Sequence, residues 1–387
     1  MKRKLRMGMV GGGPEAFIGE VHRKAARMDG KIDVLAGAFD IDPEKSRQMG
    51  ETLCIEPGRA YNTYQEMLEQ ERDRADAIDF VTIATPNKWH FPIARDCLQA
   101  GFHVMCEKPM TMTLAEAVEL REIVQKTGLV FGLMHNYTGY PMVKAAKDIV
   151  SQGDLGKILK VIVQYPQGWL SLPIERDGQP QASWRTDPKQ SGAGGCVGDI
   201  GTHAANLAEY VSGLKIDKIC ADLTTFVEGR PLDDDANCLL RFDNGARGLL
   251  HASQIAVGQE NNLAIWVHGE KGSLEWHQEN PNYLHVYGQD KPVHVWRRGN
   301  DYVAAKSPAA ARCTRVPFGH PEAFFEAFAN NYVNFAETIE AVMEKREADP
   351  LALDFPGVEQ GVRGMAFIET MVSSSASDAK WTPFSVE

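Results

Sequence analysis

Over about its first 130 residues the chain alternates short apolar runs with segments whose apolar side chains recur at helical spacing. The apolar runs lie at 5–10, 32–40, 78–86, 102–109 and 129–136. Helical segments between them lie at 43–53, 64–72, 90–101 and 114–128. Buried strands that alternate with helices are typical of a parallel sheet covered by helices on both faces. The pattern predicts an N-terminal, doubly wound α/β domain.

The pattern changes after about residue 150, where strands follow one another with only short turns between them. These strands lie at 157–167, 217–229, 236–256, 261–276 and 282–288. Turns at 244–245 (Asn-Gly) and 269–272 indicate hairpins, so we expect a large, open, mostly antiparallel sheet. Helical segments at 321–345 and 357–374 close the chain. We therefore predict a first domain at 1–134 and an α+β domain at 135–387, whose exposed sheet face joins subunits into a dimer or tetramer.

Length, charge and cysteine usage narrow the class of protein. A chain of 387 residues is too long for one core, and a net charge of −11 without a basic stripe argues against a nucleic acid partner. No apolar run approaches the roughly 20 residues that span a membrane. Glycines at 11–13 interrupt the run after the basic start, so we expect a cytoplasmic protein that is not exported. The seven cysteines are scattered and never spaced C-x-x-C, which predicts reduced thiols and no metal site.

The first strand runs into a glycine-rich loop with the spacing G-x-G-x-x-G/A, formed by Gly11, Gly13 and Ala16. In dinucleotide-binding loops these positions make the turn, admit the pyrophosphate and allow the next helix to pack closely. Pro14 is tolerated there because the first turn of a helix has unpaired N–H groups. The predicted cofactor contacts in this loop are Gly11, Gly13, Pro14, Ala16, Phe17 and Ile18. With the strand–helix pattern, the loop predicts a Rossmann fold.

Three neighbouring features refine this interpretation. Asp40 ends the second strand, where an acidic residue binds the adenosine ribose hydroxyls. No cationic pair follows Asp40 to accept a 2′-phosphate, so the predicted cofactor is NAD rather than NADP. Glu15 should point to solvent because its carboxylate would repel the pyrophosphate, and Gly19 can relieve packing one turn further in. The alternatives are a flexible loop and an ordinary turn residue at Asp40.

Three ordered motifs carry a resemblance to a known family. They are ATPNKWH at 84–90, AGFHVMCEKPMTMTLAEA at 100–117 and GGCVGDIGTH at 194–203. With the glycine loop and Asp40, they make the chain resemble the glucose–fructose oxidoreductase/inositol dehydrogenase family, Gfo/Idh/MocA. Within it, GGGPEAFIGEVHR and WRTDP look most like the levoglucosan and glycoside 3-dehydrogenase branch. The resemblance implies a Rossmann domain, an open-faced sheet domain and a tightly bound nicotinamide cofactor in the cleft between them.

The resemblance also implies further cofactor contacts. They are Thr85, Pro86, Asn87, His90, Glu107 and Lys108. The segment 85–87 would pass along the dinucleotide and Glu107 would meet the nicotinamide ribose. The peptide bond between Lys108 and Pro109 is often cis in similar proteins. His90 either caps the helix at 90–101 or lies near the cofactor, and the cap is the favoured interpretation.

Oxidation of a secondary alcohol requires a base for the hydroxyl proton and a donating group near the oxygen. Lys108 follows a predicted parallel strand, at the sheet edge where ligands bind. Asp199 and His203 are four residues apart on a helix predicted to begin near Asp199, so they share a face, although Asp199 could be a plain N-cap. The family roles make His203 the proton acceptor, Lys108 the group that holds the oxygen, and Asp199 the residue that orients His203. A lysine base with His203 as orienter is the open alternative.

The remaining predicted substrate contacts lie outside these motifs. His135 and Tyr137 follow the fifth strand, Arg185 precedes the GAGG turn, and Trp169 can stack on a sugar face, each with a packing role as the alternative. The predicted enzyme uses NAD to oxidise a secondary ring hydroxyl of a sugar, a levoglucosan-like anhydrosugar or a polyol to a ketone. The alternatives are an NAD-dependent glycoside hydrolase, an inositol dehydrogenase and a non-catalytic nucleotide-binding sensor.

Overall fold

The computed structural model describes residues 3–386, which divide into two compact units. The first unit comprises the chain up to Thr111 together with Ala115–Asn136 and Phe324–Val362. The second unit comprises Met112–Leu114, Tyr137–Ala323 and the chain from Arg363 onward. Each unit is built around its own sheet.

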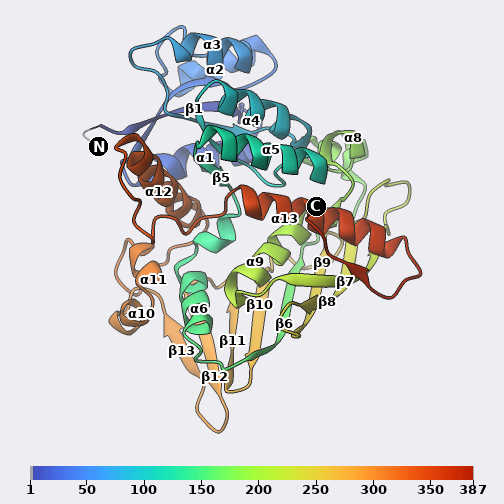
Figure 1. The fold of residues 1–387 in the computed structure, drawn as a ribbon. Coiled ribbons are helices and arrows are strands. Elements are labelled where there is room, and N and C mark those ends of the chain that lie inside the picture. Colours follow the sequence, from blue (N-terminus) through green and yellow to red (C-terminus); the bar gives the residue numbers. More distant parts are fainter. Residues whose placement is uncertain (1–2, 387) are drawn as a thin grey trace. The chain divides into compact units, whose positions relative to one another are not determined.

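The first unit contains a parallel five-stranded sheet in the order β2-β1-β3-β4-β5 (Figure 1). Its strands are β1 (Leu5–Gly11), β2 (Ile32–Ala38), β3 (Phe80–Ala84), β4 (His103–Cys106) and β5 (Phe131–Leu133). Every residue of β3 and β4 is buried, which explains why these strands appear in the sequence as continuous apolar runs. The predicted Rossmann sheet is confirmed.

Helices of the first unit connect and cover these strands. They are α1 (Phe17–Met28), α2 (Pro43–Thr52), α3 (Tyr64–Arg72), η1 (Asn87–Trp89), α4 (His90–Gln99), α5 (Leu114–Thr127) and α12 (Phe324–Met343). α12 packs along α1 and belongs to the same core, because Phe328, Tyr332 and Phe335 are buried together with Met7 and other residues of the sheet.

The second unit contains a nine-stranded sheet in the order β13-β12-β11-β10-β6-β9-β8-β7-β14. Its strands are β6 (Ile158–Pro166), β7 (Ile216–Thr224), β8 (Asp235–Phe242), β9 (Arg247–Ser253), β10 (Ala264–Gly269), β11 (Gly272–His277), β12 (Tyr283–Gly288), β13 (His294–Arg297) and β14 (Thr382–Pro383). Neighbouring strands are antiparallel except β6 and β9, which are parallel. The prediction of a large, mostly antiparallel sheet is confirmed.

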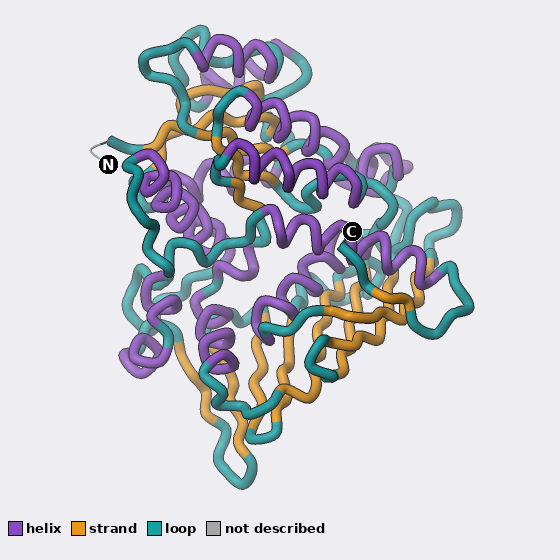
Figure 2. The backbone as a smooth tube through the Cα atoms, viewed as in Figure 1, coloured by secondary structure: helices purple, strands orange, loops and turns teal. Residues whose placement is uncertain are grey.

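Helices α6 and α9 pack on one face of this sheet (Figure 2). The helical elements of the second unit are η2 (Asn136–Gly139), α6 (Pro141–Ser151), η3 (Ile174–Asp177), α7 (Pro180–Arg185), α8 (Pro188–Ser191), η4 (Val197–Gly201), α9 (Thr202–Ser212), α10 (Asp301–Lys306) and α11 (Pro308–Arg312). Helix α13 (Val358–Ser375) begins in the first unit and ends in the second. On the opposite face, Leu239 and Leu249 are paired across β8 and β9 and are 45% and 41% exposed.

The division of the chain differs from the predicted boundary at residue 134. The first unit extends to Asn136 and recovers α12 and the start of α13 from the C-terminal region. Helix α12 belongs to the first unit because its apolar face packs against α1 and completes the core of that unit. A simple boundary was predicted because sequence patterns do not show that a distant helix returns. None of the helices in the described part of the chain is long and apolar enough to cross a membrane.

Candidate active site

Close backbone approaches shape the glycine loop. A Cβ added to Gly11 would lie 2.4 Å from the carbonyl oxygen of Ala84, and one added to Gly13 would lie 2.7 Å from the Asp40 carboxylate. A Cβ on Gly19 would lie 2.3 Å from the Cα of Gly12, so Gly19 is the glycine that lets α1 pack against the loop. The cradle is thus too narrow for side chains at three glycines, which fits a loop that receives a pyrophosphate.

The loop enters α1 later than predicted. The N–H of Ala16 donates to Gly13 O at 3.0 Å and closes a separate turn, and α1 begins at Phe17 with Ala16 as its N-cap. Pro14 therefore lies in this turn and not in the first turn of the helix. The first N–H groups of an α-helix have no partner within the helix, so those of Phe17 and Ile18 are suited to donate to an anion. Their contact with the cofactor stays a prediction.

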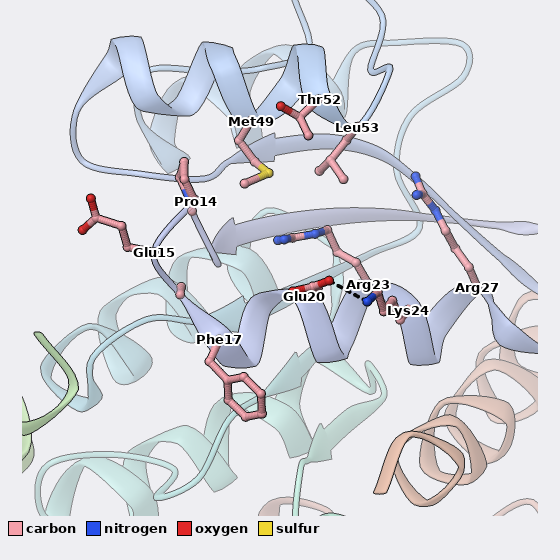
Figure 3. Close-up of a pocket in the computed structure, with 12 residues that line it drawn as sticks. Pro14, Glu15, Phe17, Glu20, Arg23, Lys24, Arg27, Met49, Thr52 and Leu53 are labelled. Carbon is pink, nitrogen blue, oxygen red and sulfur yellow. Dashed lines mark ion pairs between the residues drawn. The ribbon is translucent and has the colours of Figure 1, made fainter.

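A cavity of about 570 Å³ adjoins the loop and is lined by residues 13–17, one face of α1 and the end of α2 (Figure 3). Glu15 points away from α1, is 69% exposed in its side chain and pairs with Lys45 at 3.2 Å, so it is directed to solvent as predicted. Arg23 is only 6% exposed and donates from Nη1 to Gly12 O at 2.5 Å. The carboxylate of Glu20 interacts with Arg23 electrostatically but forms its ion pair with Lys24, so the hydrogen bond of Arg23 goes to the loop.

Asp40 follows β2 directly, at the carboxyl edge of the sheet. One carboxylate oxygen accepts from Asp42 N at 3.0 Å, and the other is the atom closest to Gly13. Asp40 and the glycine loop are therefore neighbours, which is the arrangement required for a ribose contact beside a pyrophosphate.

The segment Thr85–Asn87 follows β3, next to the loop strand β1. Thr85 Oγ1 is buried and has no hydrogen-bond partner within residues 3–386, as expected for a donor or acceptor reserved for a ligand. His90 does not cap α4, whose N-cap is Trp89 without a side-chain bond. Its ring nitrogens instead lie 2.7 Å from Pro109 O and 2.9 Å from Thr85 O. The cap interpretation was wrong, because the ring of His90 lies between the carbonyl oxygens of two segments that were predicted to contact the cofactor.

Glu107 and Lys108 follow β4, and the peptide bond between Lys108 and Pro109 is cis, as the resemblance implies. The carboxylate of Glu107 is engaged within the unit: Oε1 lies 2.8 Å from His22 Nε2, and Oε2 accepts from Lys108 N at 3.1 Å. Burial alone would raise the pKa of Glu107, but the hydrogen bond from His22 and the positive charge of Lys108 hold it below its usual value.

His135, at the end of the β5 segment, is buried in the same unit. Burial and the positive charge of Lys108 lower the pKa of His135 to about 3. This imidazole is therefore neutral at physiological pH and can accept a hydrogen bond from a substrate hydroxyl.

In the second unit, Asp199 and His203 lie on consecutive helical turns. Asp199 is part of the π-helical turn η4 and His203 of α9, so the helix begins before Asp199 and not at it. π-Helical turns are frequent at functional sites. The turn is anchored by Asp233, whose carboxylate accepts from Gly195 N and Val197 N, both at 2.7 Å.

Asp199 is held by side chains from two other elements. Gln254, after β9, donates to Oδ2 at 2.8 Å, and the Nε of Arg185 in α7 lies 3.3 Å from the same oxygen. Arg185 also stacks on Trp184, 4.2 Å from the ring centroid. The predicted residues Asp199 and Arg185 therefore meet, and Asp199 is also held by a glutamine that was not predicted.

His203 is surrounded by tyrosines. Its ring makes an edge contact with Tyr137 at 4.8 Å between centroids and a second with Tyr165 at 6.2 Å. The two tyrosine hydroxyls hydrogen-bond to each other, and Tyr165 also donates to Asn261 Oδ1 at 2.6 Å. Burial raises the pKa of Tyr165, so its hydroxyl stays protonated. His203 and Tyr137 thus belong to one polar cluster.

The cluster continues to Trp169. Gln167 donates to Asn261 Oδ1 at 2.7 Å, and Trp169 Nε1 donates to Gln167 Oε1 at 3.1 Å. Hydroxyl, amide and indole groups in one chain suit a ligand that carries several hydroxyls.

Several residues of this constellation were missed in the sequence. They are His22, Thr82, Tyr332, Tyr165, Gln167, Gln254 and Asn261. His22 was detectable as a polar residue on the apolar face of α1, between Val21 and Ala25. Tyr165, Gln167 and Trp169 alternate with period two, which places them on one side of an extended segment. Tyr332 carried no such signal because only the fold brings α12 to α1.

Comparisons with known proteins identify the family to which the two units are similar. Residues 5–135 match the oxidoreductase family with an NAD-binding Rossmann fold, and residues 143–275 match the GFO/IDH/MocA C-terminal domain. A solved inositol dehydrogenase homolog from Azotobacter vinelandii complexed with NAD+ is 38% identical, covers 99% of this chain and 98% of its own, and has a TM-score of 0.94. Its structure with NADH and myo-inositol is 37% identical, with the same coverage and a TM-score of 0.91.

Two curated relatives place the chain more finely. The uncharacterized oxidoreductase YfiI of Bacillus subtilis is 34% identical over 99% of this chain and 98% of its own length. Levoglucosan dehydrogenase from Pseudarthrobacter phenanthrenivorans is 29% identical over 73% of this chain and 76% of its own. The levoglucosan enzyme is thus more distant than the inositol dehydrogenase homolog and YfiI. With its NAD-binding Rossmann sheet, glycine cradle and open sheet domain, the chain belongs to the Gfo/Idh/MocA family of oxidoreductases.

Proposed function

We propose that this protein is an NAD-dependent dehydrogenase that oxidises a secondary ring hydroxyl of a cyclic polyol or sugar to a ketone. The observation that carries the proposal is the cluster around His203, where Asp199 and a run of tyrosine, amide and indole groups offer several contacts to a polyhydroxylated ring. Myo-inositol is bound by the Azotobacter vinelandii homolog, so cyclic polyols are the first substrates to test.

The chain's own residues supply binding and proton transfer. When bound, the nicotinamide supplies the hydride acceptor. The glycine loop, the first turn of α1 and Asp40 would hold the dinucleotide. We propose that His203 accepts the hydroxyl proton, that Lys108 donates to the same oxygen, and that Asp199, fixed by Gln254 and Arg185, binds a neighbouring hydroxyl and orients His203.

Replacing the lysine tests the assignment. Lys108→Met keeps the aliphatic stem and removes the charge and the donors. We expect NAD affinity near wild type and turnover lower by about 10²-fold or more, measured as NADH formation with a panel of cyclic polyols and sugars. His203→Ala should lose a comparable factor, and the double variant should lose less than the product of the two. Near-normal turnover by Lys108→Met on its best substrate would remove this residue from the mechanism.

The cofactor choice has its own test. We propose a preference for NAD over NADP of about tenfold or more, because the Asp40 carboxylate would repel a 2′-phosphate. Asp40→Ser should narrow the ratio of kcat/KM values for the two cofactors. Equal use of NAD and NADP by the wild-type protein would contradict this role of Asp40.

We also propose that the outer face of the nine-stranded sheet joins two copies of the chain. On this face Leu239, Leu249, Ile162 and Trp266 form a continuous row across four paired strands. Leu239 and Leu249 are exposed, and Ile162 and Trp266 are half-buried. Apolar surface of this kind is typical of interfaces. Leu249→Lys should shift the mass measured by light scattering toward the monomer; an unchanged oligomer would exclude this face.

A further inference from the structure

A buried chain of side chains leads from Glu107 into the core of the first unit. His22 Nδ1 lies 2.7 Å from the Tyr332 hydroxyl, which in turn lies 3.1 Å from Thr82 Oγ1. His22 and Thr82 are 0% exposed and Tyr332 is 1% exposed. This hydrogen-bonded network therefore joins α1, α12 and β3 to the segment after β4, and its side chains are buried away from water.

One tautomer of His22 satisfies every group in this chain. An ionised Glu107 can only accept, so His22 donates from Nε2 to Glu107 Oε1. Nδ1 then accepts from the Tyr332 hydroxyl, whose oxygen accepts from Thr82. Burial raises the pKa of Tyr332, which keeps its hydroxyl available as a donor. A fully satisfied, buried network of this kind holds its members in one arrangement.

This hydrogen-bonded network ends at the peptide group of Lys108, the proposed catalytic lysine. Glu107 Oε2 accepts from Lys108 N, while Oε1 is bound by His22. We propose that His22 is a positioning residue, whose bond to Glu107 fixes the Glu107–Lys108 turn and so presents Lys108 in a single orientation. This inference rests on the proposed dehydrogenase function of Lys108.

The electrostatics predict how the turn responds when His22 is removed. Burial would raise the pKa of Glu107, and the His22 bond is the first of the contributions that hold it down. Without that bond the pKa of Glu107 should rise, so the carboxyl binds a proton at higher pH. A protonated Glu107 accepts less strongly from Lys108 N, which loosens the turn.

The other titratable groups near Glu107 should not produce the same shift of the pH profile. Lys108 lies beside it, and His90 and His135 interact with it electrostatically from α4 and from the end of β5. Burial lowers the pKa of His90, and burial with Lys108 lowers that of His135 to about 3. His135 thus stays neutral where the Glu107 carboxyl would begin to bind its proton.

The experiment compares three variants with a matched control in the holoenzyme. His22→Leu removes both ring nitrogens, His22→Gln keeps a donor toward Glu107, and Tyr332→Phe removes only the partner of Nδ1. His103→Leu is the control, because His103 is also buried in the first unit but accepts from Val130 N and does not touch Glu107. Turnover is measured against pH, and thermal unfolding is recorded for each variant.

We expect His22→Leu to lower kcat by at least about tenfold, since misplacing a catalytic group by about 1 Å can cost about 10²-fold. Its acid limb in the pH profile should move to higher pH, and His22→Gln should restore part of both effects. Tyr332→Phe should lose a few-fold. His103→Leu should lower only the unfolding temperature. Equal losses in His22→Leu and His103→Leu without a shift of the acid limb would reduce His22 to a structural role.

A second readout does not depend on turnover. Infrared difference spectra during pH titration show protonation of a buried carboxyl, and the band of Glu107 is identified by its loss in Glu107→Gln. In His22→Leu this band should appear at higher pH than in the wild type. If the band moves but no substrate is oxidised, the dehydrogenase proposal fails while the His22–Glu107 link stands; an unmoved band overturns the link itself.

Discussion

The two units support their site residues in opposite ways. In the first unit, His22 bonds Glu107, the residue before Lys108, and is itself bonded by Tyr332 of the apolar core. In the second, His203 and Asp199 are surrounded by amide and hydroxyl groups on strand ends and loops, such as Asn261.

The difference matches the ligands that we propose for the two units. A dinucleotide is always the same molecule, so a rigid cradle with backbone donors suffices. A ring with several hydroxyls requires many directed hydrogen bonds, and loops can exchange these without disturbing the core. We therefore expect variants of the glycine loop in the first unit to change cofactor affinity, and variants around Asp199 and His203 in the second unit to change turnover and substrate parameters.

The sharpest way to break this separation is at the glycine loop. Gly19→Ala places a Cβ 2.3 Å from the Cα of Gly12, which must force the loop away from α1. We expect NAD affinity to fall by about 10²-fold, measured by quenching of protein fluorescence. Gly364→Ala, at a helical position with nothing within 4 Å, is the control and should bind NAD normally. Normal binding by Gly19→Ala would mean that this close approach does not shape the cofactor site.

The anchor of the second site should have the next largest effect. Asp233→Ala leaves the N–H groups of Gly195 and Val197 without their acceptor, so the turn carrying Asp199 loosens. We expect turnover to fall about tenfold and unfolding free energy by about 2 kcal/mol, with NAD affinity unchanged. Asp235→Ala, two residues further along the chain and partly exposed, should change none of these three quantities. Loss of NAD binding in Asp233→Ala would contradict the separation of the units.

A smaller effect is expected inside the polar cluster. Asn261→Leu removes the acceptor shared by Tyr165 and Gln167. KM for the polyol should rise by about fivefold while the affinity for NAD stays constant, because the amide orders groups that meet only the substrate. Steady-state kinetics at saturating NAD measures the change. A fall in kcat at constant KM would instead place Asn261 with the proton-transfer groups.

The smallest effect is expected at Glu15. Its exposed carboxylate pairs with Lys45, and exposed pairs contribute little free energy. Glu15→Gly should therefore change the dissociation constant of NAD by less than about twofold, and Glu15→Gln should match it. A large gain in affinity would show that the carboxylate turns toward the phosphates in solution.

Features formed by residues that are close in the sequence could be predicted, whereas contacts between residues that are far apart in the sequence could not. Most strands of both sheets, the glycine loop and the pair Asp199–His203 are local patterns, and the structure contains them. The edge strands β13 and β14 were not among the predicted strands. Asp199 was expected to begin the helix because a π-helical turn has no recognised sequence pattern. The partners Tyr332 and Gln254 could not be predicted, since they lie 310 and 55 residues from the side chains that they hold.

The buried Arg23 has a consequence for how cofactor binding responds to salt. Arg23 is 6% exposed, and its guanidinium donates a hydrogen bond to the carbonyl oxygen of Gly12 from inside the domain. Mobile ions screen a mostly buried charge less than they screen an exposed one such as Lys24, whose side chain is 59% exposed. The part of the loop's attraction for a dinucleotide that comes from Arg23 should thus weaken less with rising ionic strength than the part that comes from exposed cations, so this contribution to cofactor retention persists as the salt content of the surroundings varies.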